Sequence, residues 1–100
     1  MLHIVNKSPG ERATLASCLA HARPGHCVLL IEDAVYAATK GHAAGAQVAK
    51  ALGGGVKVYV LTADLEARAR AGAVADGVVQ VDYKGFVDLV AKNPRVQSWL

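Results

Sequence analysis

The chain has 100 residues, of which 53% are hydrophobic and 19% charged, and its formal net charge is +3. This length predicts one domain, residues 1–100, with a single core. The composition is too apolar for a disordered chain, and the basic residues are too scattered for a surface that binds nucleic acid directly. No apolar run is long enough to span a membrane and the first residues lack a signal peptide, so a cytoplasmic protein with free thiols is expected.

Short apolar runs alternate with amphipathic stretches along the whole chain. In chain order the pattern predicts strand 2–5, helix 8–22, strand 27–31, helix 34–39, helix 43–52, strand 56–61, helix 63–71, strand 77–81 and helix 83–92. The apolar tail at residues 96–100 is expected either to pair as an edge strand or to dock on a partner. This alternation predicts an α/β domain of three layers, with a mostly parallel central sheet flanked by helices.

Capping residues indicate where four of the helices begin. Ser8 followed by Pro9, then Asp33, Thr62 and Asp82, each stand at the start of a predicted helix. Their side-chain oxygens can accept a backbone N–H of the first helical turn, and proline suits the first helical position. Polar residues that follow the strands, at positions 6–8, 32–33 and 62–64, are expected at the carboxyl edge of the sheet, where α/β folds bind ligands.

The sequence carries no recognisable cofactor or metal motif. The glycines at positions 41–45 and 53–55 lack the spacing of phosphate-binding loops, which weighs against a nucleotide- or flavodoxin-like binding domain. Histidines at positions 3, 21, 26 and 42 lack the spacing of a zinc site. No cofactor and no metal are therefore expected.

Cys18 is the main candidate for covalent chemistry. On a helical wheel it borders the apolar stripe made by Leu15, Leu19 and Ala22, with His21 one turn further on. This placement allows a partly exposed thiol, with the imidazole of His21 within reach as an assisting base. The alternative is a small buried hydrophobe, and the position near the C-terminal end of the helix does nothing to lower the thiol pKa.

The sequence also predicts where three further side chains lie. Cys27 opens the apolar strand at residues 27–31 and is expected in the core, so Cys18 should react with iodoacetamide before Cys27. Trp99 and Leu100, at the apolar tail, are expected at an interface with a partner chain, although Trp99 can equally dock on its own domain.

Several segments, spread over the whole chain, resemble one known family. They are residues 1–9, 29–38, 57–68, 81–89 and 96–100. Together they are similar to the DsrH/TusB family. The Glu11-Arg12 and Ser17-Cys18-Leu19 pattern is closer to the DsrH branch of sulfur-oxidising bacteria than to the TusB branch, whose members typically lack the cysteine.

The resemblance implies a small α/β fold and a place in a complex of three related subunits. The partners would be a DsrE/TusD-like and a DsrF/TusC-like subunit in a heterohexamer, together with a DsrC/TusE-like sulfur carrier. Such complexes relay persulfide sulfur, either toward 2-thiolation of the tRNA wobble uridine (TusBCD) or in cytoplasmic sulfur oxidation (DsrEFH). The main sulfur-carrying cysteine belongs to the DsrE/TusD subunit. The family cysteine that maps onto this chain is Cys18.

The resulting hypothesis is a thiol relay in which Cys18 is an auxiliary persulfide carrier and His21 assists its deprotonation. A thiolate attacks a sulfane sulfur, holds it as a persulfide and passes it to a second thiolate. The alternative is a non-catalytic structural subunit that positions the partner's active cysteine. Because the chain is so apolar, it is expected to form a homo-oligomer when it is isolated from its partners.

Overall fold

A parallel sheet forms the centre of the computed structural model, which describes residues 1–7 and 14–99. Within these residues the sheet has five strands in the order β4-β3-β2-β1-β5, and every neighbouring pair is parallel. The strands are β1 (Leu2–Val5), β2 (Cys27–Leu30), β3 (Lys57–Leu61), β4 (Val79–Val81) and β5 (Val96–Trp99). The apolar tail therefore pairs as an edge strand, beside β1.

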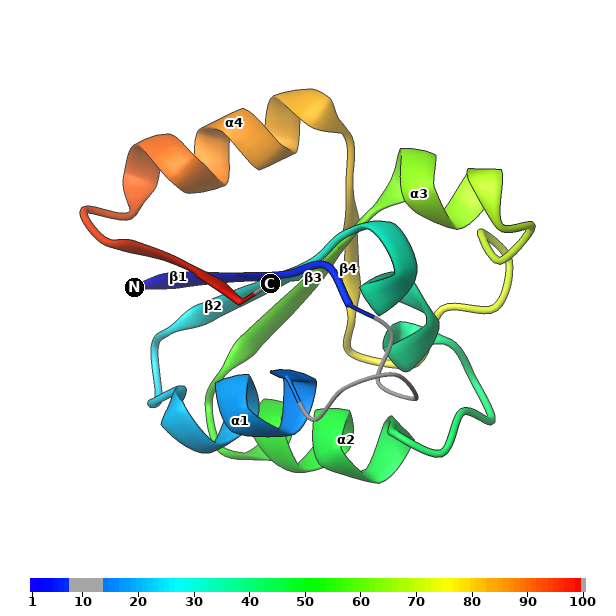
Figure 1. Ribbon diagram of the computed structural model, residues 1–100, viewed down its shortest axis with the longest axis horizontal. Helices are drawn as coiled ribbons and strands as arrows, with labels where there is room; N and C mark the ends of the chain where they lie inside the picture. The colour runs from blue at the N-terminus through cyan, green and yellow to red at the C-terminus, as the bar shows by residue number, and fades with distance from the viewer. Residues whose placement is uncertain (8–13, 100) are drawn as a thin grey trace.

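Helices lie on both sides of this sheet. They are α1 (Thr14–His21), the 3-10 helix η1 (Glu32–Ala38), α2 (Gly45–Gly53), α3 (Thr62–Ala67) and α4 (Tyr83–Lys92). Figure 1 shows α1 and α2 on one side of the sheet and α4 on the other. The predicted three-layer α/β fold is confirmed. None of the helices within residues 14–99 combines the length and the apolar character needed to cross a bilayer.

The sheet face toward α1 and α2, called the α1/α2 face below, carries the main core. Successive side chains of a strand point to opposite faces, so Val5, Val28 and Val58 share this face with their i+2 neighbours. These valines belong to one buried cluster with Leu15 of α1 and Val48 of α2. The continuous apolar run of β2 is explained by this arrangement, because both faces of a central parallel strand are covered.

The opposite face, called the α4 face, is covered less completely. Leu2, Leu29 and Leu61 are buried on it, yet α4 itself has no fully buried residue. Gly85 of α4 sits close to the side chain of Val81, and an added Cβ would lie 2.9 Å from the Cβ of Val81. Glycine therefore lets the start of the helix approach β4.

The structure tests three of the four capping predictions. Asp82 caps α4 as predicted, since its Oδ1 accepts the N–H of Gly85 at 2.8 Å. The predictions for Asp33 and Thr62 are wrong, because both residues lie inside their helices and neither helix has a side-chain cap. The Ser8-Pro9 start lies outside the described residues.

Candidate functional site

Cys18 lies in the core and not at its border. Its exposed fraction is 0%, and it belongs to the buried cluster between α1 and the sheet. Burial raises the pKa of its thiol to about 12, because a low-polarity environment disfavours the charged thiolate. The prediction of a partly exposed thiol is therefore wrong. The physical reason is that the sheet covers the helix over a wider arc than the Leu15, Leu19 and Ala22 stripe indicated.

The side chain of His21 interacts with Ser17 and Trp99. It is exposed, and its Nδ1 lies 2.8 Å from the carbonyl oxygen of Ser17. Its ring lies against Trp99, with the ring centroids 5.4 Å apart. The hydrogen bonds of the described residues do not join His21 to Cys18. Among the described residues, Cys18 and His21 therefore do not form a thiol–imidazole pair that is ready for sulfur transfer.

Cys27 is the more accessible of the two thiols. It is half-buried at the start of β2, on the α4 face, and it stands opposite Lys57 of β3 in the sheet register. Burial, followed by the charge and the hydrogen bond of the Cys27 thiol, raises the pKa of Tyr59. The prediction that Cys27 is a core residue is wrong in this respect, because the cover of the α4 face is incomplete at the start of the strand.

Polar residues meet at the carboxyl edge of the sheet, as their positions directly after the predicted strands indicated. Asp64 accepts the backbone N–H of Glu32 at 2.7 Å, which joins the ends of β2 and β3. Arg68 donates to Asp33 Oδ1 through Nε at 3.0 Å and Nη2 at 2.9 Å. Glu32 has a φ of 50°, a left-handed conformation that a non-glycine residue adopts at a cost. Arg68 was not predicted, because its partner lies 35 residues earlier in the sequence.

The side chain of Asn6 completes the same edge at the end of β1. Its Oδ1 is buried and has no hydrogen-bond partner among the described residues. No group of three or more His, Cys, Asp or Glu side chains within residues 1–7 and 14–99 is placed to hold a metal ion.

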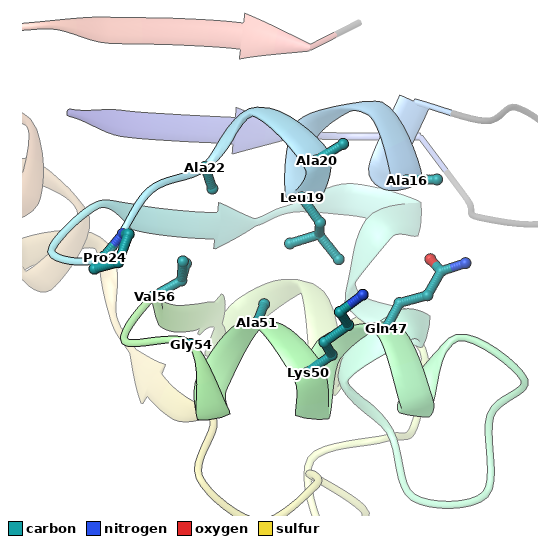
Figure 2. A pocket seen from close by; sticks show the side chains of 10 residues that line it. All are labelled: Ala16, Leu19, Ala20, Ala22, Pro24, Gln47, Lys50, Ala51, Gly54 and Val56. Atoms are coloured by element: carbon teal, nitrogen blue, oxygen red, sulfur yellow. The ribbon is translucent and has the colours of Figure 1, made fainter.

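An apolar groove of about 360 Å³ runs between α1 and α2. Figure 2 shows Leu19 of α1 reaching into the groove, with the side chains of Lys50 and Gln47 rising from α2 at one end. The lining residues are Ala16, Leu19, Ala20, Ala22, Pro24, Gln47, Lys50, Ala51, Gly54 and Val56. Cys18 does not line the groove, so the groove gives a ligand no contact with that thiol.

Trp99 packs on its own domain. Its ring is half-buried against the α1/α2 core, and its indole Nε1–H donates to Nδ1 of His3 at 3.1 Å. Of the two alternatives for Trp99, docking on the chain itself is the one that the structure contains. Leu100 lies outside the described residues, and its predicted interface role stays a prediction.

Known proteins of similar sequence cover the whole length of the chain. The TusB protein of Escherichia coli K12 is 33% identical over 99 residues, which are 99% of this chain and 100% of the relative. The TusB protein of Erwinia tasmaniensis is 35% identical over the same shares.

Solved structures of lower identity share the fold. The crystal structure of the ychN protein from Escherichia coli superposes with a TM-score of 0.80 at 18% identity and covers 97% of both chains. The structure of MTH1491 from Methanobacterium thermoautotrophicum, described as a protein of unknown function, gives 0.76 at 16% identity and covers 97% of this chain and 95% of its own. These likenesses confirm the α/β architecture.

A family match settles the relationship that the sequence segments indicated. Residues 7–96 match the family described as DsrH like protein. Among the described residues, this span includes β2, β3 and β4 in full, the first residue of β5 and all the described helices, whereas β1 precedes it. With TusB relatives above 30% identity over the full length, the chain belongs to the DsrH family of sulfur relay subunits.

Proposed function

We propose that this chain is one of three related subunits in a cytoplasmic complex that relays persulfide sulfur toward 2-thiolation of the tRNA wobble uridine. The observation that carries the proposal is the match to TusB relatives over essentially the whole chain. The partners would be a TusD-like subunit with the main sulfur-carrying cysteine, a TusC-like subunit and a TusE-like carrier. Sulfur oxidation through a DsrEFH-type complex uses the same subunit plan, and is the second candidate because of the Ser17-Cys18-Leu19 pattern.

The exposed side of α4 supports an assembly with other subunits. Tyr83, Val87 and Val90 recur at i, i+4 and i+7, so they lie on one face of the helix. Their side chains are 65%, 63% and 39% exposed. Such exposure is unusual for three large hydrophobic side chains that lie next to one another on a helix surface. We call these three residues the α4 stripe. Val79 on β4 and Val96 on β5 are also exposed, at the two edges of the sheet.

Burial of Cys18 sets a condition on its part in the relay. In the proposed step, its thiolate attacks the outer sulfur of a partner persulfide, a new S–S bond forms at Cys18, and the partner thiolate leaves. No oxidant is consumed, since the sulfane sulfur only changes its attachment. With a pKa of about 12 and no exposed surface, Cys18 can take this role only when partner binding moves α1 from the sheet. His21 would then be the imidazole nearest in sequence.

Co-expression with the two sister subunits tests the assembly. Light scattering should give a heterohexamer for the three chains together and a homo-oligomer for this chain alone. A monomer at micromolar concentration that the sister subunits leave unchanged would overturn the proposed assembly.

Mass spectrometry of the loaded complex tests the relay. After incubation with a persulfide donor, the mass of one sulfur atom should appear on the TusD-like cysteine, with a smaller fraction on Cys18. Cys18→Ser should lower transfer to the TusE-like carrier, and Cys27→Ser is the matched control. If Cys18 never carries sulfur and its variant transfers at the wild-type rate, the chain acts as a structural subunit.

Alkylation of the cysteines tests whether partner binding moves α1 away from the sheet. In the isolated chain, iodoacetamide should label Cys27 at least about tenfold faster than Cys18, because Cys18 has neither exposed surface nor accessible thiolate. This order is the reverse of the one expected from the sequence, because Cys18 is buried and Cys27 is only half-buried. In the complex, the proposal expects Cys18 to gain reactivity relative to that baseline. Equal protection of Cys18 in both states would contradict the opening of α1.

A further inference from the structure

A chain of hydrogen bonds between aromatic side chains fastens the C-terminal strand to the sheet. The indole Nε1–H of Trp99 donates to His3 Nδ1 at 3.1 Å, and His3 Nε2 lies 3.1 Å from His26 Nδ1. The backbone N–H of Arg23 donates to the same His26 nitrogen at 3.1 Å. These hydrogen bonds connect β5, β1 and the turn before β2.

The partners at each end determine where the protons lie. Indole and backbone N–H groups can only donate, so Nδ1 of His3 and Nδ1 of His26 must both be unprotonated acceptors. The proton of neutral His3 therefore lies on Nε2 and is donated to His26. Neutral His26 carries its own proton on Nε2. The whole network requires both imidazoles to be neutral.

The network is the main side-chain attachment of β5. Val96, Gln97 and Ser98 are exposed, whereas Trp99 is half-buried and packs on the α1/α2 core. The strand has only one neighbour in the sheet, β1, which it meets over four residue pairs. His3, which holds the indole, is only 2% exposed. Loss of the His3–Trp99 bond would leave a short edge strand attached by its backbone and by the packing of the Trp99 ring.

We propose that His3, His26 and Trp99 form a proton-sensitive latch, which holds β5 on the sheet while both imidazoles are neutral and releases it when one of them is protonated. A second proton on His3 can bind only at Nδ1, where it would face the indole N–H. A second proton on His26 can bind only at Nδ1, where it would face the N–H groups of Arg23 and His3. Either event replaces a hydrogen bond with two opposed donors.

The electrostatic surroundings favour the neutral state of the latch. Burial, His26, the N-terminal ammonium of Met1 and His21 lower the pKa of His3 from its ordinary value of 6.5, in that order of importance. Burial, the same ammonium and Arg23 lower the pKa of His26. Release of β5 removes the cover of Trp99 from His3 and with it part of the burial that lowers the His3 pKa, so the released state binds a proton on His3 more tightly. The latch is therefore closed above pH 6.5 and opens increasingly as the pH falls below it.

Fluorescence can follow this opening directly, because Trp99 is the only tryptophan of the chain. On titration of the full chain below pH 6.5, emission should shift to longer wavelength and quenching by acrylamide should increase. His3→Gln keeps an oxygen that can accept the indole N–H but cannot be protonated, so most of the change should disappear. His21→Gln removes only the exposed imidazole beside the indole and should keep the change.

Hydrogen exchange measures the opening of β5 in the wild-type chain, so this test does not require that any variant fold. Between pH 6.5 and the lowered pKa, the opening constant of β5 should rise by up to about tenfold per pH unit for one linked proton. After correction for intrinsic exchange, the amides of β5 should lose protection while those of β2 keep theirs. Protection that falls in β2 and β5 together, or a fluorescence change that His3→Gln keeps and His21→Gln removes, would overturn the latch.

Discussion

The two faces of the sheet differ in how completely helices cover them. The α1/α2 face is closed by a continuous cluster that includes Leu15, Cys18 and Val48, whereas α4 crosses the other face without burying any residue fully. The first face carries the main buried cluster of the described residues. The second leaves the α4 stripe exposed, and it also leaves Cys27 half-buried. The contrast agrees with the proposal that the α4 side of the sheet binds the partner subunits, while the α1/α2 face supplies most of the core.

The largest effect is expected from a truncation on the closed face. Leu15→Ala removes a side chain that is 1% exposed in the main core, and it should lower the free energy of unfolding by about 3 kcal/mol through lost burial and a new cavity. Urea denaturation of the isolated chain would measure it. A loss below about 1 kcal/mol would mean that the α1/α2 face is less tightly packed than described.

The two cysteines allow a matched comparison of the faces. Cys18→Ser should cost about 1–3 kcal/mol, because it places a hydroxyl in an apolar core. Cys27→Ser, on the less covered face, should change the unfolding free energy by no more than about 0.5 kcal/mol. The same denaturation experiment separates them, and a larger cost for Cys27→Ser would reverse the assignment of the two faces.

A smaller loss is expected when the inner side of α4 is truncated. Leu89 is half-buried, so Leu89→Ala should cost only about 1 kcal/mol in the isolated chain, well below a fully buried leucine. Thermal unfolding with and without the sister subunits would test whether the cost grows on assembly. A cost equal to that of Leu15→Ala would show that both faces contribute equally to stability.

The smallest effect on stability should come with the largest effect on assembly. Val87→Lys changes the middle of the α4 stripe at a side chain that is 63% exposed, so the unfolding free energy should stay within about 0.5 kcal/mol of wild type. Light scattering should nevertheless show loss of the complex, since a buried, unpaired ammonium is costly. Asp88→Lys, on the neighbouring face of the same helix, is the control and should assemble normally.

Local signals in the sequence predicted much of the fold. The strand at residues 2–5 and the helix at residues 83–92 have the predicted bounds, because an apolar run and an Asp82 cap are complete within a few residues. The other described strands and helices were predicted with ends that differ by a few residues. The helix α3 ends at Ala67 and not near residue 71, since Ala69 adopts a φ of 56° and breaks the helical path.

The candidate site was harder to predict because it depends on distant contacts. The helical wheel placed Cys18 correctly on α1 but could not show how far the sheet reaches around that helix. Trp99 and His3 are 96 residues apart, and Arg68 and Asp33 are 35 apart. Neither pair leaves a spacing signal in one sequence. The exposure of Cys27 likewise depends on how α4 lies over the sheet. The pattern of apolar residues within β2 carries no information about that arrangement.

Pairing of the first strand with the last has a consequence for the order of synthesis. One edge of β1 is completed by β5, whose residues are made long after those of β1. Until β5 has been made, and in any product that stops before residue 96, β1 presents unpaired N–H and C=O groups along that edge. Such an edge is a template for other strands. Forms truncated before β5 should therefore aggregate more readily than the loss of one short edge strand would indicate.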